Sequence, residues 1–269
     1  MGRLSGKVAF ITGGARGQGR SHAVRLAQEG ADIVVSDVCG PVEGNMVQDS
    51  TIEDLQETAQ LVEETGQRVL TRQVDVRDLP ALQSLADDTM AQFGRMDVVV
   101  ANAGILAWGR AWELSSDEWR SVIDVNLTGV FHTIRATVPH LIEQGQGGSV
   151  ILISSSAGLK GQPFTLHYTA AKHGVVGICR GLASELGEYD IRVNSVHPAG
   201  VRTAMMDVPG LWKMIQEKAE TLGPVFMNTL PHESMDPEEI SATVAWLASD
   251  DARYITGAQI PVDFGTCNR

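Results

Sequence analysis

Two side chains near the middle of the chain have the types and the spacing of an acid–base pair. Tyr168 and Lys172 lie four residues apart in a segment with helical periodicity, 165–186, so they share one face of a helix. A phenol titrates at about pH 10, and a neighbouring ammonium lowers its pKa, so it can exchange a proton with an alcohol or carbonyl oxygen. Ser155 precedes this helix and can donate a hydrogen bond to the same oxygen. Since a Tyr–Lys pair alone is commonplace on solvated helices, the assignment depends on the rest of the chain.

The glycine-rich turn that follows the apolar run at 8–11 predicts a cofactor. The turn leads into a helical pattern at 21–29 and contains Gly13, Gly17 and Gly19. Glycines let backbone approach a ligand closely, and the N-terminus of a helix offers N–H groups to a pyrophosphate. The order strand, turn, helix therefore favours a dinucleotide site over a plain surface turn.

Asp37 bears on which dinucleotide binds. It ends the second predicted strand, 33–36, at roughly the offset of 20 residues from the glycine turn where an acid meets the adenosine ribose. A carboxylate there accepts hydrogen bonds from both ribose hydroxyls and repels a 2′-phosphate. Arg16 favours NADP instead, because a cation in the glycine turn can bind a 2′-phosphate. We give Asp37 more weight, and the sequence favours NAD over NADP.

The loop at 38–50 is longer than most loops that join a strand to a helix. One interpretation is a surface insertion, and the other is a flap over the adenosine half of the cofactor, because the loop starts beside Asp37. Ser50 and Glu53 are expected to form a capping box for the next helix, and a later capping box, Ser115 and Glu118, is expected to open one long helix that runs to about residue 144.

Strand and helix patterns alternate to the end of the chain, which predicts a parallel sheet covered on both faces. The expected fold is α/β, a single-domain Rossmann fold over 1–269 with a doubly wound parallel sheet of about seven strands. Polar or turn residues follow five of the strands and should meet at one sheet edge; these are Asp37, Asp75, Asn102, Ser155 and Pro198. The Met-rich segment 203–235 is either ordinary core or an apolar lid over the substrate, and its position favours the lid.

Composition excludes several classes of function. The 269 residues carry a formal net charge of -12, which disfavours nucleic acid as a partner. Three dispersed cysteines indicate neither a disulfide framework nor a metal site, and a reducing, cytoplasmic location is expected. We find no signal peptide and no apolar run of the roughly 18 residues that span a bilayer, so no membrane association is expected.

These motifs together resemble those of the short-chain dehydrogenase/reductase family over nearly the whole chain. The family's glycine motif is matched by Thr12, Gly13, Gly17 and Gly19, and its Asn-Ala-Gly motif by Asn102, Ala103 and Gly104. Its catalytic set is matched by Asn126, Ser155, Tyr168 and Lys172, and its Pro-Gly motif by Pro198 and Gly200. Ala101 stands where the family has a further Asn. Within the serine run, Ser154 or Ser156 could replace Ser155.

The resemblance implies a role for each matched residue. Tyr168 is the general acid/base, Lys172 holds the nicotinamide ribose, Ser155 binds the substrate oxygen, and Asn126 orders a water that links Lys172 to solvent. Asp75 and Val76 would contact adenine, Asn102 and Gly104 the ribose side, and Val201 and Thr203 the carboxamide. The full set expected to bind NAD is Gly13, Arg16, Gly17, Gln18, Gly19, Asp37, Asp75, Val76, Asn102, Gly104, Tyr168, Lys172, Pro198, Val201 and Thr203. No metal ligand is expected, and the family usually forms homotetramers.

A narrower resemblance concerns the mycofactocin-coupled, carveol-dehydrogenase-like enzymes. It rests on residues 14–23, on the long loop after Asp37 and on residues 157–161. In that subgroup the loop buries NAD, which a redox partner reoxidises in place.

The sequence thus predicts an NAD-dependent oxidoreductase that interconverts a secondary alcohol and a ketone, on a small apolar, terpenoid-like substrate. The alternatives are a 3-oxoacyl-carrier or hydroxysteroid reductase and, from another class, a cofactor-sensing binding protein without turnover.

Overall fold

A single parallel sheet carries the chain. The computed structural model describes residues 2–208 and 210–268. The strands are β1 Val8–Thr12, β2 Asp32–Asp37, β3 Val69–Gln73, β4 Val98–Ala101, β5 Gly148–Ile153, β6 Ile191–Pro198 and β7 Gln259–Val262. Their order across the sheet is β3-β2-β1-β4-β5-β6-β7, and every neighbouring pair is parallel. This confirms the doubly wound sheet, with the change of winding direction between β1 and β4.

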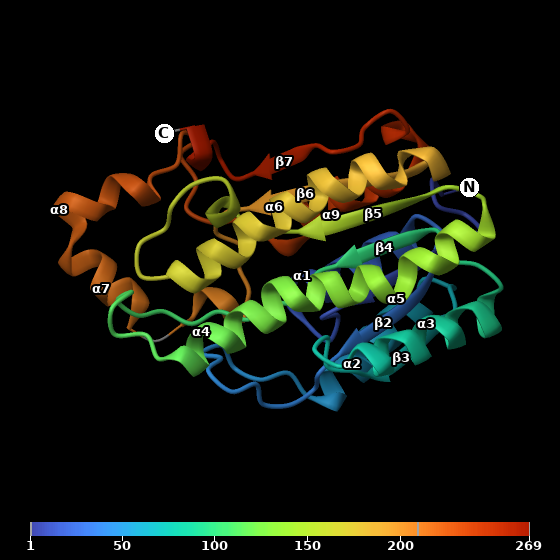
Figure 1. The fold of residues 1–269 in the computed structure, drawn as a ribbon, viewed down its shortest axis with the longest axis horizontal. Coiled ribbons are helices and arrows are strands. Elements are labelled where there is room, and N and C mark those ends of the chain that lie inside the picture. Colours follow the sequence, from blue (N-terminus) through green and yellow to red (C-terminus); the bar gives the residue numbers. More distant parts are fainter. Residues whose placement is uncertain (1, 209, 269) are drawn as a thin grey trace.

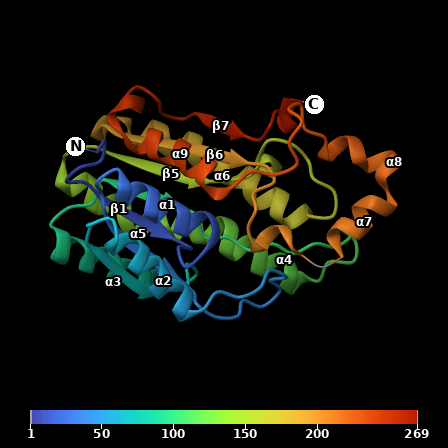
Figure 2. The same cartoon turned by 180° about the vertical axis from the view of Figure 1, so that it is seen from behind.

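Helices cover both faces of the sheet (Figures 1 and 2). They are α1 Gly17–Gln28, α2 Ile52–Glu63, α3 Leu79–Phe93, α4 Ser116–Ile123, α5 Gly129–Gln144, α6 Leu166–Leu186, α7 Leu211–Glu217, α8 Ala219–Leu222 and α9 Pro237–Ala248. The first, second and ninth helices lie on one face, and α3 to α6 lie on the other. The short helices α7 and α8 belong to neither layer and extend beyond one end of the sheet (Figure 1).

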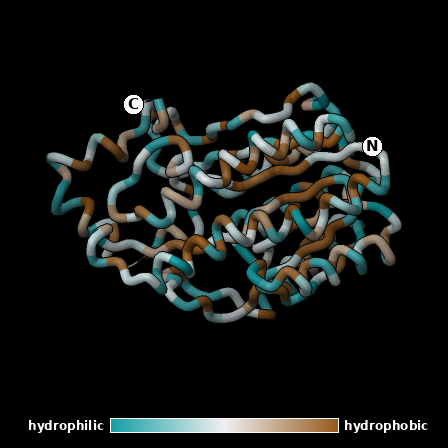
Figure 3. The backbone as a smooth tube through the Cα atoms, in the orientation of Figure 1, coloured by the Kyte–Doolittle hydropathy of each residue, from teal (hydrophilic) through white to brown (hydrophobic). Residues whose placement is uncertain are grey.

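Each face of the sheet has its own hydrophobic core, because successive side chains of a strand point to opposite faces. In β1, Phe10 packs with buried residues of α3, α5 and α6, whereas Ala9 and Ile11 pack with those of α1, α2 and α9. The central strands of the sheet form continuous hydrophobic stretches in Figure 3. Burial on both faces explains why the strands read as continuous apolar runs.

Two local predictions were wrong. The capping box of α2 consists of Thr51 and Asp54 rather than Ser50 and Glu53: Thr51 Oγ1 accepts from Asp54 N at 3.1 Å, and Asp54 Oδ2 accepts from Thr51 N at 2.8 Å. The helix expected to run unbroken from residue 115 to 144 contains a π-helical turn, Asp124–Thr128, between α4 and α5. Such turns re-aim side chains and are frequent at functional sites.

Candidate active site

The glycine turn approaches its neighbours too closely for any other residue. A Cβ at Gly13, where φ is +68°, would lie 2.6 Å from Ala103 Cα, and one at Gly19 would lie 2.0 Å from Gly13 O. The N-cap residue of α1, Arg16, makes no side-chain cap hydrogen bond, so the first turn keeps its N–H groups available for an anion. The turn therefore fits the pyrophosphate of a dinucleotide.

Asn102 fastens this turn to the end of β4. Its Nδ2 donates to Thr12 O at 3.0 Å and to Gly13 O at 2.9 Å, and Thr12 Oγ1 accepts from Asn102 N at 3.2 Å. Asn102 also lines the cleft beside the turn. Its side chain thus supports the cofactor site chiefly by holding backbone in place.

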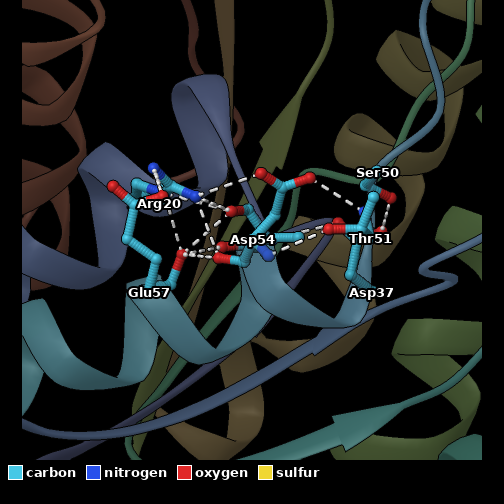
Figure 4. Close-up of polar contacts among 9 residues, drawn as sticks. Arg20, Asp37, Ser50, Thr51, Asp54 and Glu57 are labelled. Carbon is cyan, nitrogen blue, oxygen red and sulfur yellow. Dashed lines mark hydrogen bonds and ion pairs between the residues drawn. The ribbon is translucent and has the colours of Figure 1, made fainter.

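Asp37 lies at the end of β2, where its carboxylate is 8 % exposed. Oδ2 accepts from Ala15 N at 3.0 Å, and Oδ1 accepts from Ser50 Oγ at 2.6 Å and from Cys39 N at 3.2 Å. A carboxylate has about four acceptor positions, so this arrangement leaves one for a ribose hydroxyl rather than the two expected. Sequence analysis missed the contact because Ser50 matched a helix cap, whereas its hydroxyl binds Asp37 (Figure 4).

A second network that was not predicted ties the turn to α2 (Figure 4). Arg20 Nη2 donates to Ala15 O at 2.7 Å, and Arg20 Nη1 pairs with Glu57 Oε2 at 2.8 Å. Thr58 Oγ1 also donates to Ala15 O, at 3.0 Å. Together with the bond from Ala15 N to Asp37, these contacts fix both backbone polar groups of Ala15 in the cofactor-binding turn.

The loop at 38–50 covers the cleft. Two residues of the loop, Val42 and Val47, have buried side chains that pack against the hydrophobic core, and both line the cleft. Met46 N donates to Leu106 O at 3.0 Å, and Ser121 Oγ donates to Glu43 O. These contacts join the loop to the chain segment after β4 and to α4, which supports the flap and disfavours a detached surface insertion.

The predicted adenine contacts lie on the opposite wall of the same cleft. Asp75 and Val76 both line it, together with Arg16 and Gly104. The Asp75 carboxylate pairs with Arg77 Nη2 at 2.5 Å. The pKa of Asp75 is lowered: burial alone would raise it, but hydrogen bonds from Arg77 outweigh burial.

Among the three serines after β5, the structure singles out Ser155. Ser154 Oγ is buried and donates to Lys172 O at 3.0 Å, and Ser156 Oγ is buried and accepts from Gln162 Nε2 at 3.2 Å. Ser155 Oγ instead accepts from Ala157 N at 3.1 Å, and the Ser155 side chain counteracts the effect of burial on the pKa of Tyr168. Ser155 is therefore the serine that can share a substrate oxygen with Tyr168.

His197 makes a hydrogen bond with the backbone of Ser155, and this contact was not predicted. Its Nδ1 lies 2.8 Å from Ser155 O, and its Nε2 lies 2.8 Å from Ser195 Oγ. Burial lowers the pKa of His197 to about 4, so the ring is neutral. Because a carbonyl can only accept, Nδ1 carries the proton and donates to Ser155 O.

Tyr168 and Lys172 project from α6 into this region, with exposed fractions of 8 % and 3 %. Lys172 Nζ donates to Ile153 O at 2.9 Å and lies 5.4 Å from the centre of the Tyr168 ring. Burial raises the pKa of Tyr168 to about 12, against the opposing effect of its hydrogen bond with Ser155. Burial also lowers the pKa of Lys172 to about 8.

The expected lowering of the Tyr168 pKa is therefore wrong for the protein without its cofactor. Both groups lie in a poorly solvated region, where the charged forms of phenol and amine are each disfavoured. Desolvation by burial dominates the pKa of Tyr168, and the opposing effect of Ser155 is smaller.

Asn126 lies in the π-helical turn and is fully buried. Its Nδ2 donates to Val122 O at 2.9 Å and to Ile105 O at 3.1 Å, whereas Oδ1 has no partner among the described residues. The position a Cβ would take on Gly104 lies 2.8 Å from Asn126 Oδ1 and 3.7 Å from Lys172 Nζ. The absent side chain of Gly104 thus leaves room for a polar atom between Asn126 and Lys172.

A second cavity, of about 760 Å³, adjoins the cofactor cleft. The two share Gln18, Ser154, Tyr168, Thr203 and Met205. Pro198 and Val201 were predicted to bind the cofactor, but they line this second cavity and not the cleft; Thr203 lines both.

Two further classes of site are absent from residues 2–208 and 210–268. No group of three or more His, Cys, Asp or Glu side chains is arranged to hold a metal ion there. None of the helices described is long and apolar enough to cross a bilayer.

Comparison with known proteins identifies the family. The enoyl-(acyl carrier protein) reductase profile matches residues 13–267. An uncharacterized NAD-dependent oxidoreductase of Mycobacterium tuberculosis is 53 % identical over 98 % of this chain and 97 % of its own. The (-)-trans-carveol dehydrogenase of Rhodococcus erythropolis is 44 % identical over 99 % of both chains.

Among solved structures, a short-chain dehydrogenase from Mycobacterium paratuberculosis bound to NAD is 47 % identical, covers 100 % of both chains and superimposes with a TM-score of 0.95. The cofactor is NAD, in agreement with the fit of the glycine turn and the carboxylate of Asp37. The protein is an NAD-dependent oxidoreductase and belongs to the short-chain dehydrogenase/reductase family.

Proposed function

We propose that this protein interconverts a secondary alcohol and a ketone, with Tyr168 as the acid/base. One observation carries the proposal: Tyr168 lines both the cofactor cleft and the 760 Å³ cavity, and Ser155 lines the same cavity. A substrate in the larger cavity would therefore meet the cofactor at the phenol oxygen.

Each residue of the site has one task in this reaction. Tyr168 takes the proton of the alcohol in oxidation and returns it in reduction, while Ser155 donates a hydrogen bond to the same substrate oxygen. Lys172 would hold the nicotinamide ribose, and a water in the space between Lys172 and Asn126 would carry the proton toward solvent. Bound NAD supplies the hydride acceptor, and its cationic ring favours the phenolate that burial opposes.

The lining of the larger cavity supports an apolar, terpenoid-like substrate. Apolar side chains from the segment after β6 form much of its wall; among them are Met205, Met206, Leu211, Trp212, Ile215 and Phe226. The same segment, 203–235, is proposed as the lid of a single domain; position 209 lies outside the described residues. The likeness to a carveol dehydrogenase agrees with this substrate class.

A larger substrate is the second candidate. Ligand cavities of roughly 300–1,000 Å³ accommodate drug-sized molecules, and 760 Å³ exceeds what a small terpenoid alcohol requires. This volume favours a hydroxysteroid or a 3-oxoacyl carrier. A binding protein without turnover is disfavoured, because Asn126, Ser155, Tyr168 and Lys172 are all brought together.

A panel of secondary alcohols tests these candidates by NADH formation. The expected result is the highest kcat/KM for cyclic terpenoid alcohols, with lower values for hydroxysteroids and hydroxyacyl thioesters. A preference for either of the latter would replace the first candidate by the second. Absence of turnover on every class would favour the binding protein.

The flap supports a further part of the proposal, that bound NAD is retained and reoxidised in place by a redox partner, as in mycofactocin-coupled enzymes. The buried Val42 and Val47 and the contacts of Met46 with Leu106 hold the loop over the cleft. Denaturing the purified protein should release about one NAD per chain, detectable by mass spectrometry. Protein purified without nucleotide would contradict retention.

A homotetramer in the cytoplasm completes the proposal. Exposed apolar side chains on α4 to α6, Trp119, Phe131 and Leu166, offer a surface for self-association, and size-exclusion chromatography with light scattering tests it. Three free thiols, Cys39, Cys179 and Cys267, suit a reducing compartment.

A further inference from the structure

Gln18 occupies a special place in the site. It is the second residue of α1, and its side chain lines both the cofactor cleft and the larger cavity. Tyr168 and Thr203 line both as well. A methyl group on the adjacent Gly17 would lie 3.3 Å from Thr203 Cγ2, so Thr203 closes directly over the glycine turn at this point. Gln18 therefore lies at the passage between cofactor and substrate.

One atom of this side chain lacks a partner. Oε1 of Gln18 is buried and accepts no hydrogen bond from any residue that the structure describes. A buried acceptor without a donor costs free energy that a ligand donor can recover. A neutral N–H or O–H group suits this atom better than a cation, because a neutral acceptor does not offset the cost of burying a positive charge.

The cofactor brings such a group to this place. Hydride transfer beside Tyr168 requires the nicotinamide ring at the passage that Gln18, Tyr168 and Thr203 share, and the ring carries a carboxamide with an NH₂ donor. We infer that Gln18 Oε1 accepts a hydrogen bond from one proton of this NH₂ group, beside the carboxamide contact expected of Thr203, and thereby fixes which face of the ring is turned toward the larger cavity. Gln18 is thus a positioning residue; the inference rests on the proposed meeting of cofactor and substrate at Tyr168.

A nucleotide analogue isolates this contact. 3-Acetylpyridine adenine dinucleotide keeps the ring carbonyl and carries a methyl group in place of NH₂. Purified protein is incubated with excess NAD and analogue in equal amounts until the ratio of bound nucleotides is constant. After removal of free nucleotide, mass spectrometry gives that ratio, and no substrate turnover is needed.

The wild-type protein should retain NAD over the analogue by about fivefold or more, the usual worth of one such hydrogen bond. Gln18→Leu should bring the ratio close to one, and Gln18→Glu, which keeps an acceptor of the same length, should preserve the preference. Ser50→Ala is the matched control: it lies at the adenosine end of the cleft and should change the binding of both nucleotides by one factor.

Three outcomes would overturn the inference: equal binding of both nucleotides by the wild type, an unchanged ratio in Gln18→Leu, or a ratio lowered equally by Ser50→Ala. If Gln18→Leu does not fold, Gln18→Asn withdraws the oxygen by one carbon and must lower the ratio. The proposed reaction is judged separately, by alcohol oxidation in the wild type. A Gln18-dependent ratio in a protein that oxidises no alcohol would support this contact and refute that reaction.

Discussion

Replacing Lys172 by methionine should abolish activity and yet stabilise the protein. Burial lowers the pKa of Lys172 from 10.5 to about 8. At 1.36 kcal/mol for each pH unit, keeping this ammonium in the folded protein near neutral pH costs on the order of 3 kcal/mol. Methionine removes that cost and loses the hydrogen bond to Ile153 O, worth about 1 kcal/mol. The net gain is about 2 kcal/mol, or roughly 5 °C in Tm for a chain of this size.

The pH dependence of this gain gives the sharper test. The folded-state pKa of Lys172 lies below its ordinary value, so between about pH 8 and pH 10.5 the unfolded chain binds more protons than the folded protein. The wild type therefore gains stability as the pH rises through this window, and Lys172→Met lacks that gain. The difference in Tm should be largest below pH 8, should shrink between pH 8 and pH 10.5, and should reverse in favour of the wild type above pH 10.5, where only the lost hydrogen bond to Ile153 O remains.

Thermal unfolding of nucleotide-free protein, followed by circular dichroism at several pH values, measures both effects. Lys160→Met is the matched control, because Lys160 Nζ also donates to a backbone carbonyl, Thr266 O at 2.8 Å, from a half-buried position. It should give no increase in Tm. A Lys172→Met protein that is less stable than the wild type at neutral pH, or a difference in Tm that does not vary with pH, would refute the reasoning.

Three other substitutions test the remaining parts of the site. Asp37→Ala should relax the discrimination against NADP by about tenfold or more, measured as the ratio of kcat/KM for the two cofactors; an unchanged ratio would contradict the role of Asp37. Ser155→Ala should lower kcat about a hundredfold with little change in NAD affinity; a purely KM effect would count against a transition-state contact. Gly104→Ala places a methyl group 2.8 Å from Asn126 Oδ1 and should slow proton exchange with solvent, seen as a larger solvent isotope effect on kcat; an unaltered isotope effect would argue against the water.

Sequence predicted the fold well, for physical reasons. Strands buried on both faces are short apolar runs, and glycines at which a Cβ would lie within 3 Å of another backbone atom, such as Gly13 and Gly19, leave no room for a side chain. Both signals are local in sequence. The carboxyl ends of parallel strands meet at one edge, so the convergence of Asp37, Asn102 and Ser155 also followed from the strand order.

Contacts between distant segments could not be predicted in this way. Ser50 was assigned to a helix cap, since cap preferences are local, whereas its hydroxyl binds a carboxylate thirteen positions earlier in the chain. His197 reads as one more polar residue in β6 until its ring is seen behind Ser155. The pKa of Tyr168 was expected to fall because a lysine is near, but burial raises it. The spacing of two residues in the sequence does not show whether their side chains are buried.

The most direct test of the proposed chemistry is the comparison of wild-type protein with Tyr168→Phe, using the best secondary alcohol from the panel. NADH formation is followed by absorbance, and bound NAD is quantified in the same samples. We expect Tyr168→Phe to bind NAD as the wild type does and to form NADH at least a thousandfold more slowly, on the order of what a general base contributes. Retained turnover in Tyr168→Phe would show that another group moves the proton and would contradict the account.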